Sequence, residues 1–196
     1  MLHTIRCIGY AAANRIAAAA RLDLGATRKI LDLLSTQGLT SQVEGESDSW
    51  GLTERGREED AARIDLELDV SNTRIHVESA FDAFLELNPP LLQVCHDWQM
   101  HVVGGTPVLN DHSDADYDVA VIERLAKIHR SIGRLVDDLT IQLARFGTYG
   151  ARLSDAFERV DRGEHAFFTD RLDSYHTVWF QLHEDLLSTL GRSREG

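Results

Sequence analysis

Two stretches decide how the N-terminal third of this chain folds: residues 27–40, TRKILDLLSTQGLT, and residues 50–58, WGLTERGRE. In the first stretch, leucine and isoleucine recur at the spacing of one helix face. We expect Thr27 to cap this helix and Gly38 to end it. In the second stretch, we expect Thr53 to cap a further helix, with Glu54 in the first turn, where the helix dipole favours an acid.

The residues around these stretches predict the neighbouring elements. A helix over residues 4–10, with Leu2 just ahead, and an Ala-rich helix over residues 11–22 precede a break at residues 23–25. Between the two quoted stretches, residues 39–43 and 49–52 are expected to form short strands around a polar tip at residues 44–48.

Helix, helix, helix, short hairpin, helix is the order of a winged helix-turn-helix. The segment TRKILDLLSTQGLT…WGLTERGRE resembles the MarR-like and related winged-helix transcription regulators. These often end the recognition helix in a Gly-Leu pair and close the wing with Leu-Thr-x-x-Gly-Arg, as Gly38-Leu39 and Leu52 to Arg57 do here. The resemblance covers roughly residues 1–65, one third of the chain.

The resemblance implies binding to double-stranded DNA through the helix that begins near Thr27, because a recognition helix presents its N-terminal residues to the major groove. The expected DNA-binding residues are Thr27, Arg28, Lys29, Ser35 and Thr36. Arginine can read guanine, and lysine suits phosphate. The expected wing tip, Glu44-Gly45-Glu46-Ser47-Asp48, departs from the family because its three acids would repel phosphate. Either the recognition helix binds alone, or the protein does not bind DNA.

Composition limits the class of protein. The chain has 196 residues and a net charge of −12, which argues against a protein that simply coats nucleic acid. Residues 1–41 nevertheless carry five basic and two acidic side chains. No apolar run approaches the roughly 18–20 residues of a membrane helix. Cys7 and Cys95 form no CxxC pair, so we expect a cytoplasmic protein without a disulfide framework.

Beyond residue 70 the pattern stays helical. We expect helices over residues 71–87, stopped by Asn88-Pro89-Pro90, and over 91–100, followed by a long loop at 104–113. Further helices are a long one running towards residue 146, capped by Asp114 or Asp116, and two at 153–160 and 173–190. The predicted fold is therefore mainly α: a winged helix-turn-helix with a small β wing at 1–68, and an all-α ligand-binding and dimerisation domain at 69–196.

Eight of the nine histidines lie in this second domain, several of them beside tryptophan and aspartate. A pocket with a few convergent polar groups needs such a mixture, whereas a solvated surface seldom does. The expected ligand-binding residues are His96, Trp98, Asp111, His112, Tyr175, His176, Trp179 and His183. The blander interpretation is that the aromatic side chains form the core and that the histidines cap helices or hydrogen-bond internally.

No complete metal or catalytic motif is present. His176 and His183 lie about 10 Å apart along a helix, too far to share an ion. The run Asp114-x-Asp116-x-Asp118 begins like an EF-hand but lacks the glycine and glutamate that must follow. A divalent-metal site assembled from His96, His112 and His176 remains an open alternative. Cys95 is most simply a buried core residue.

These observations favour a homodimeric transcription regulator whose helical domain senses a small molecule. The alternative is an enzyme, or a metal-binding or small-molecule-binding protein, that uses the His/Asp/Trp-rich helical domain on a winged-helix scaffold no longer able to bind DNA. A third class, a protein–protein adaptor that docks through the winged helix, predicts an exposed apolar patch on that domain.

Overall fold

A computed structural model describes residues 1–42 and 48–192, with the side chain of Val103 left out. The protein is mainly α-helical, with small antiparallel sheets. Two compact units make up the chain: one contains Met1–Arg74 together with the residues from Gln181 on, and the other contains Ile75–Phe180. The sequence predicts domains at 1–68 and 69–196, so it assigns the C-terminal residues to the second domain. No helix in the described part of the chain has the length and apolar character that a membrane span needs.

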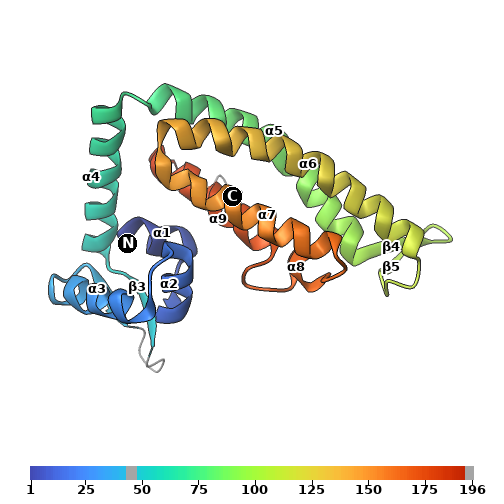
Figure 1. The fold of residues 1–196 in the computed structure, drawn as a ribbon, viewed down its shortest axis with the longest axis horizontal. Coiled ribbons are helices and arrows are strands. Elements are labelled where there is room, and N and C mark those ends of the chain that lie inside the picture. Colours follow the sequence, from blue (N-terminus) through green and yellow to red (C-terminus); the bar gives the residue numbers. More distant parts are fainter. Residues whose placement is uncertain (43–47, 193–196) are drawn as a thin grey trace. The chain divides into compact units, whose positions relative to one another are not determined.

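The first unit begins with three helices and a small sheet (Figure 1). Its elements are α1 (Leu2–Ile8), β1 (Ala11–Ala12), α2 (Ala13–Ala20), α3 (Leu24–Thr36), β2 (Thr40–Gln42), β3 (Ser49–Leu52) and α4 (Glu54–Ser71). The sheet is antiparallel with strand order β1-β3-β2, and it pairs Ala11 with Trp50 and Thr40 with Leu52. The first strand occupies residues expected to open the Ala-rich helix, because pairing with β3 draws Ala11 and Ala12 into the sheet.

The core of this unit draws side chains from each of the three helices and from the sheet. Ile5, Ile16 and Leu31 are almost completely buried, and each such side chain contributes roughly 1.5–3 kcal/mol by leaving water. The remaining members are Leu2, Ala11, Ala13, Leu34, Leu39, Trp50 and Leu52. One face of α3 is therefore fixed against the core, and the opposite face is exposed.

The start of α3 differs from the sequence expectation. Asp23, not Thr27, caps the helix, because Asp23 Oδ1 accepts a hydrogen bond from the Ala26 amide at 2.9 Å. The expected break at residues 23–25 is therefore the cap and the first turn. Thr27 is fully buried, and its hydroxyl donates to the Asp23 carbonyl at 2.9 Å. The prediction that Thr27 caps the helix is wrong because an aspartate four residues earlier takes that position.

The end of α3 and the start of α4, which the sequence predicts on either side of the first hairpin, are confirmed. Gly38, with φ +70°, follows the last turn of α3, and its amide donates to the Ser35 carbonyl. Thr53 caps α4 by accepting from the Gly56 amide at 3.0 Å, and its hydroxyl donates to the Gly38 carbonyl at 2.7 Å. One threonine thus ties the start of α4 to the end of α3.

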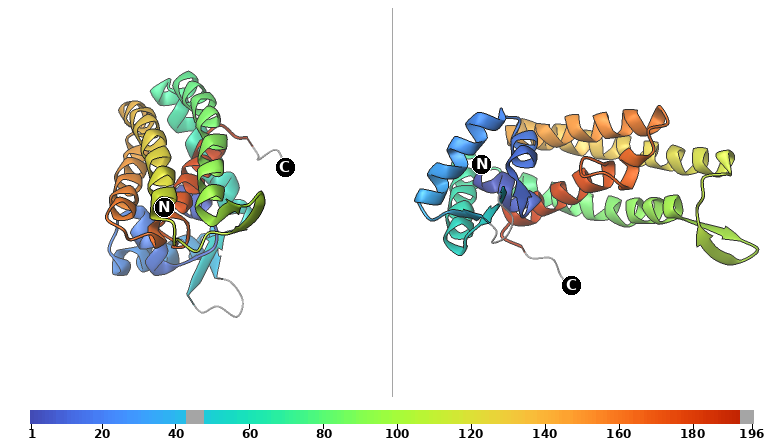
Figure 2. Two further views of the ribbon diagram at one scale, coloured as in Figure 1. Left: turned by 90° about the vertical axis from the view of Figure 1, so that its right-hand side faces the viewer. Right: turned by 90° about the horizontal axis from the view of Figure 1, so that it is seen from below.

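The second unit contains long helices and a hairpin (Figure 2). Its elements are α5 (Arg74–Gln99), β4 (Met100–Val103), β5 (Thr106–Leu109), α6 (Ala115–Gln142), a 3-10 turn (Ala144–Phe146), α7 (Gly147–Asp161), α8 (Ala166–Thr169) and the beginning of α9 (Tyr175–Thr189). The helices α6 and α7 pack side by side, and the hairpin lies where α5 ends and α6 begins. Asp114 caps α6 by accepting from the Tyr117 amide, which decides between the two caps expected there.

Two expectations for this unit are wrong. Residues 71–100 were expected to form two helices separated by Pro89 and Pro90, but α5 runs through both prolines. The rings of both prolines are exposed, while Phe84 and Leu91 on either side of them are fully buried. Packing therefore holds the helix together although neither proline has a backbone N–H to donate. The domain is also not all-α, because residues 100–109, which include the end of an expected helix and part of the expected loop, form the β4–β5 hairpin. Gly104 and Gly105, both with positive φ, make its two-residue turn.

Candidate functional site

The exposed face of α3 carries four of the five expected DNA-binding residues. Arg28, Lys29, Ser35 and Thr36 are exposed, whereas Thr27 is buried and cannot reach a ligand. Because the buried side of α3 is fixed against the core, the four exposed side chains belong to a rigid element rather than to a loop. This face offers two cations and two hydroxyls, the groups that contact phosphates and base edges.

Part of the expected acidic wing can be placed. Asp48 Oδ2 lies 3.2 Å from Arg28 Nη2, and both side chains are about half exposed, at 43% and 54%. An ion pair this exposed is worth little, so a phosphate could compete with the carboxylate for Arg28. The other residues of the expected tip, 44–47, lie outside the described residues.

The expected ligand-binding residues of the helical domain do not form one pocket. Trp98 and His112 do meet, with ring centroids 4.4 Å apart, and His165 joins them at 5.0 Å from Trp98. His112, in a left-handed conformation with φ +58°, places its Nδ1 2.9 Å from Asp118 Oδ2. Asn110 donates to the other oxygen of the same carboxylate at 2.8 Å. The sequence did not single out His165, Asn110 or Asp118 as ligand-binding residues, because they converge only through packing.

The other expected ligand-binding residues lie elsewhere. His96 is exposed on α5, and Asp111 is exposed in the turn before α6, where hydrogen bonds from Ser113 lower the pKa of its carboxyl group. Burial lowers the pKa of the half-buried His176. His183 lies in the part of α9 assigned to the first unit.

Tyr175 and Trp179 belong to the core of the second unit rather than to a pocket wall. Trp179 Nε1 donates to Asn88 Oδ1 at 2.9 Å, and its ring centroid lies 4.8 Å from that of Phe84. The Tyr175 hydroxyl lies 3.4 Å from His129 Nδ1, and burial raises the pKa of Tyr175. The burial of these aromatic side chains supports the interpretation that they form the core.

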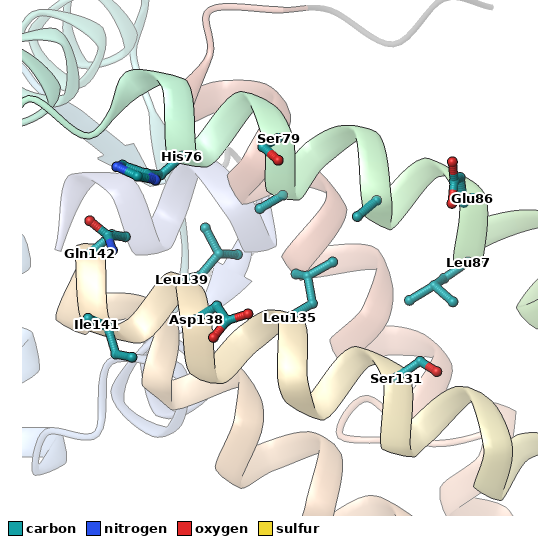
Figure 3. Close-up of a pocket in the computed structure, with 12 residues that line it drawn as sticks. His76, Ser79, Glu86, Leu87, Ser131, Leu135, Asp138, Leu139, Ile141 and Gln142 are labelled. Atoms are coloured by element: carbon teal, nitrogen blue, oxygen red, sulfur yellow. The ribbon is translucent and has the colours of Figure 1, made fainter.

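A groove that the sequence did not predict runs between α5 and α6. Its volume is about 580 Å³, within the range of small-molecule sites. Figure 3 shows side chains from the two helices lining it, with His76 and Glu86 on α5 and Asp138 and Gln142 on α6. Leu135 and Leu139 add apolar surface. No expected ligand-binding residue lines this groove, because the density of histidines along the sequence does not show where space remains between packed helices.

The described residues do not bring His96, His112 and His176 together as metal ligands; the one group of three such side chains found there is His3, Cys7 and Asp185. The His3 ring lies between two buried carboxylates, with Nδ1 3.0 Å from Asp60 Oδ2 and Nε2 3.0 Å from Asp185 Oδ1. Burial alone would lower the pKa of His3, but the charge of Asp185 and the hydrogen bonds that the ring donates to both carboxylates raise it to about 12. The sequence missed this group because its members are up to 182 residues apart.

Comparison of the chain with protein-family models, with curated proteins and with solved structures gave no match.

Proposed function

We propose that the protein is a DNA-binding transcription regulator, with α3 as the recognition helix of a winged helix-turn-helix. The observation that carries the proposal is the exposed row of Arg28, Lys29, Ser35 and Thr36 on a helix whose other face is buried. The element order and the strand order β1-β3-β2 are those of a winged helix, which supports the same assignment. The net-positive balance of residues 1–41 within an acidic chain favours this surface for binding a polyanion.

The second unit is proposed to dimerise and to bind a small-molecule effector. We propose the groove between α5 and α6 as the effector site, rather than the expected histidines, which lie apart from one another. This groove has the volume of a ligand site and both apolar and ionisable walls. An effector that binds one arrangement of the dimer more tightly would shift the population towards it and so change DNA affinity.

Binding of the full-length protein to a labelled duplex from its gene's own upstream region tests the proposal. Fluorescence anisotropy at about 50 mM and about 200 mM salt should show selective binding that weakens with salt. The double variant Arg28→Ala/Lys29→Ala should bind about tenfold or more weakly, because a bidentate base contact is worth about 1–3 kcal/mol. Lys127→Ala/Arg130→Ala is the matched control, since it removes one lysine and one arginine from an exposed part of α6. Binding no tighter than to random DNA, by folded protein at low salt, would contradict the proposal.

A second candidate function is small-molecule or metal chemistry in the second unit, on a scaffold that does not bind DNA. The observation that favours it is the cluster of Trp98, His112, His165 and Asp118, which combines stacking surface with a histidine–carboxylate pair. Small-molecule binding that is lost in both His112→Ala and Asp118→Asn, in a protein without DNA preference, would favour this candidate.

A further inference from the structure

We propose that His3, Cys7 and Asp185 form a binding site for a transition-metal dication, with Zn²⁺ as the preferred ion. His3 and Cys7 are four residues apart on α1, so both side chains lie on the same helix face. Asp185 comes from α9 and belongs to the same compact unit. One ligand atom from each side chain lies within 4.8 Å of the other two. The site is distinct from the α3 surface and does not depend on whether the protein binds DNA.

The donor set fits zinc in chemistry and in distance. One imidazole, one thiolate and one carboxylate are ligands that Zn²⁺ takes in proteins, and the thiolate disfavours Mg²⁺ and Ca²⁺. Zinc–ligand bonds of about 2.0–2.3 Å place the ligand atoms of a tetrahedral site roughly 3.3–3.8 Å apart. His3 Nε2 and Asp185 Oδ1 are already 3.0 Å apart, so small side-chain shifts within the 4.8 Å group would complete the geometry. Three protein ligands leave the fourth position for water.

The surrounding hydrogen bonds orient the proposed ligands. Asp60 Oδ2, 3.0 Å from His3 Nδ1, can accept a hydrogen bond from the N–H of that nitrogen and leave Nε2 directed at Asp185. A carboxylate behind a ligating histidine is a regular feature of protein zinc sites, because it fixes the tautomer and the ring plane. The Thr189 hydroxyl donates to Asp185 Oδ1 at 3.1 Å and restrains that carboxylate. Asp60, Cys7 and Asp185 are all buried, which shields the ion from bulk solvent.

Metal binding at this group must displace two protons, because the ligand atoms bind in their deprotonated forms. Binding displaces the Nε2 proton of the His3 imidazolium and the proton of the Cys7 thiol, and both protons leave to solvent. The two charges of the dication replace those of the two protons, so the net charge of the group stays the same. Cys7 is in no disulfide, so its sulfur needs no reduction before it can bind a metal.

Metal titration of the full chain, after removal of adventitious metal with a chelator, tests the proposal. The expected result is one equivalent of Zn²⁺, and with Co²⁺ a near-ultraviolet thiolate-to-cobalt charge-transfer band. Cys7→Ser should abolish the band, whereas Cys95→Ser, which removes the other buried thiol, should leave it unchanged. Asp60→Asn should weaken zinc binding by roughly 10–100-fold, as expected for a group that orients a ligand.

X-ray absorption of the zinc-loaded wild-type and Cys95→Ser proteins keeps the test decisive if Cys7→Ser does not fold. Both spectra should show one sulfur at about 2.3 Å with nitrogen or oxygen at about 2.0 Å. Failure of the wild type to retain zinc, or a cobalt band that persists in folded Cys7→Ser, would overturn the proposal. Loss of the sulfur signal in Cys95→Ser would do the same. None of these measurements involves DNA, so their outcome is independent of the proposed regulator function.

Discussion

The buried Trp179 indole makes a hydrogen bond to a residue far away in the chain. The indole of Trp179 is 2% exposed, and its N–H donates to Asn88, 91 residues earlier in the chain. Such a bond contributes little net free energy when it forms, but loss of one partner leaves a buried donor unsatisfied. The energetic importance of Asn88 therefore lies in what its removal would leave behind.

We predict that Asn88→Ala lowers the free energy of unfolding by about 1–3 kcal/mol, because the indole N–H then has no acceptor. Urea denaturation monitored by circular dichroism measures the change. In a Trp179→Phe background, which has no indole N–H, the same substitution should cost clearly less. Equal losses in the two backgrounds would show that the hydrogen bond is not the cause.

A half-buried histidine makes stability depend on pH. His129 stacks on Phe157 with ring centroids 4.5 Å apart, and burial, helped by Arg130, lowers its pKa from the ordinary value of 6.5. Above that value both the folded and the unfolded chain hold His129 neutral. Below it the unfolded chain takes up a proton that the folded chain resists, so stability falls as the pH falls.

We predict that the unfolding free energy of the wild type decreases from about pH 7 to about pH 5 more steeply than that of His129→Gln. The difference between the two proteins at each pH isolates His129 from the other titrating groups, His176 among them. Chemical denaturation in a series of buffers provides the data. A difference that stays constant across this range would contradict the assignment.

At the scale of elements, the close approach of α4 to the backbone before β2 explains one residue of the Leu-Thr-x-x-Gly-Arg sequence. A Cβ atom on Gly56 would lie 2.0 Å from the Leu39 carbonyl oxygen. That carbonyl also accepts from the Thr53 amide at 3.1 Å, so it cannot move without breaking the start of α4. Glycine at position 56 is therefore required by the contact between two elements.

We predict that Gly56→Ala lowers the free energy of unfolding by about 1–3 kcal/mol, because the backbone must shift to admit the methyl group. Gly133→Ala on α6 is the matched control: its Cβ would meet nothing within 4 Å, and alanine is the better helix former by about 0.5–1 kcal/mol. Melting temperatures of the two variants should therefore move in opposite directions. A Gly56→Ala variant as stable as the wild type would refute the proposed close contact.

At the scale of the whole molecule, charge is distributed unevenly along the chain. The net charge is −12, yet residues 1–41 are net positive, and Arg28 and Lys29 stand exposed on α3. The proposed association with DNA would work against the field of the acidic remainder, and it should depend strongly on ionic strength. The exposed Asp48 carboxylate next to Arg28 adds a local competitor for the phosphate.

We predict that Arg28→Ala/Lys29→Ala reduces the slope of log affinity against log salt by about 2 for each protomer bound, if both side chains contact phosphate. Asp48→Asn should act in the opposite direction and tighten binding, because it frees Arg28 from its ion pair. Titrations over a range of salt concentrations measure both effects. A slope that is the same in wild type and double variant would exclude these residues from the DNA contact.

The sequence by itself determined the features that depend on neighbours along the chain. Helical periodicity and local capping chemistry predicted the mainly α class, the end of α3 at Gly38 and the Thr53 cap, and they narrowed the cap of α6 to Asp114 or Asp116. Composition also indicated the absence of a membrane-spanning helix, and none occurs among the described residues. These signals are strong because a cap or a helix stripe is satisfied within a few residues.

Only the tertiary structure decided the features that depend on contacts between distant residues. Packing carries α5 through Pro89 and Pro90 against local propensity. The convergence of Trp98, His112 and His165, and the separation of His96 from them, follow from how helices pack rather than from histidine density. The His3–Cys7–Asp185 group joins the two ends of the chain. Sequence spacing cannot encode such pairs, because the burial that brings them together exists only once the whole unit has folded.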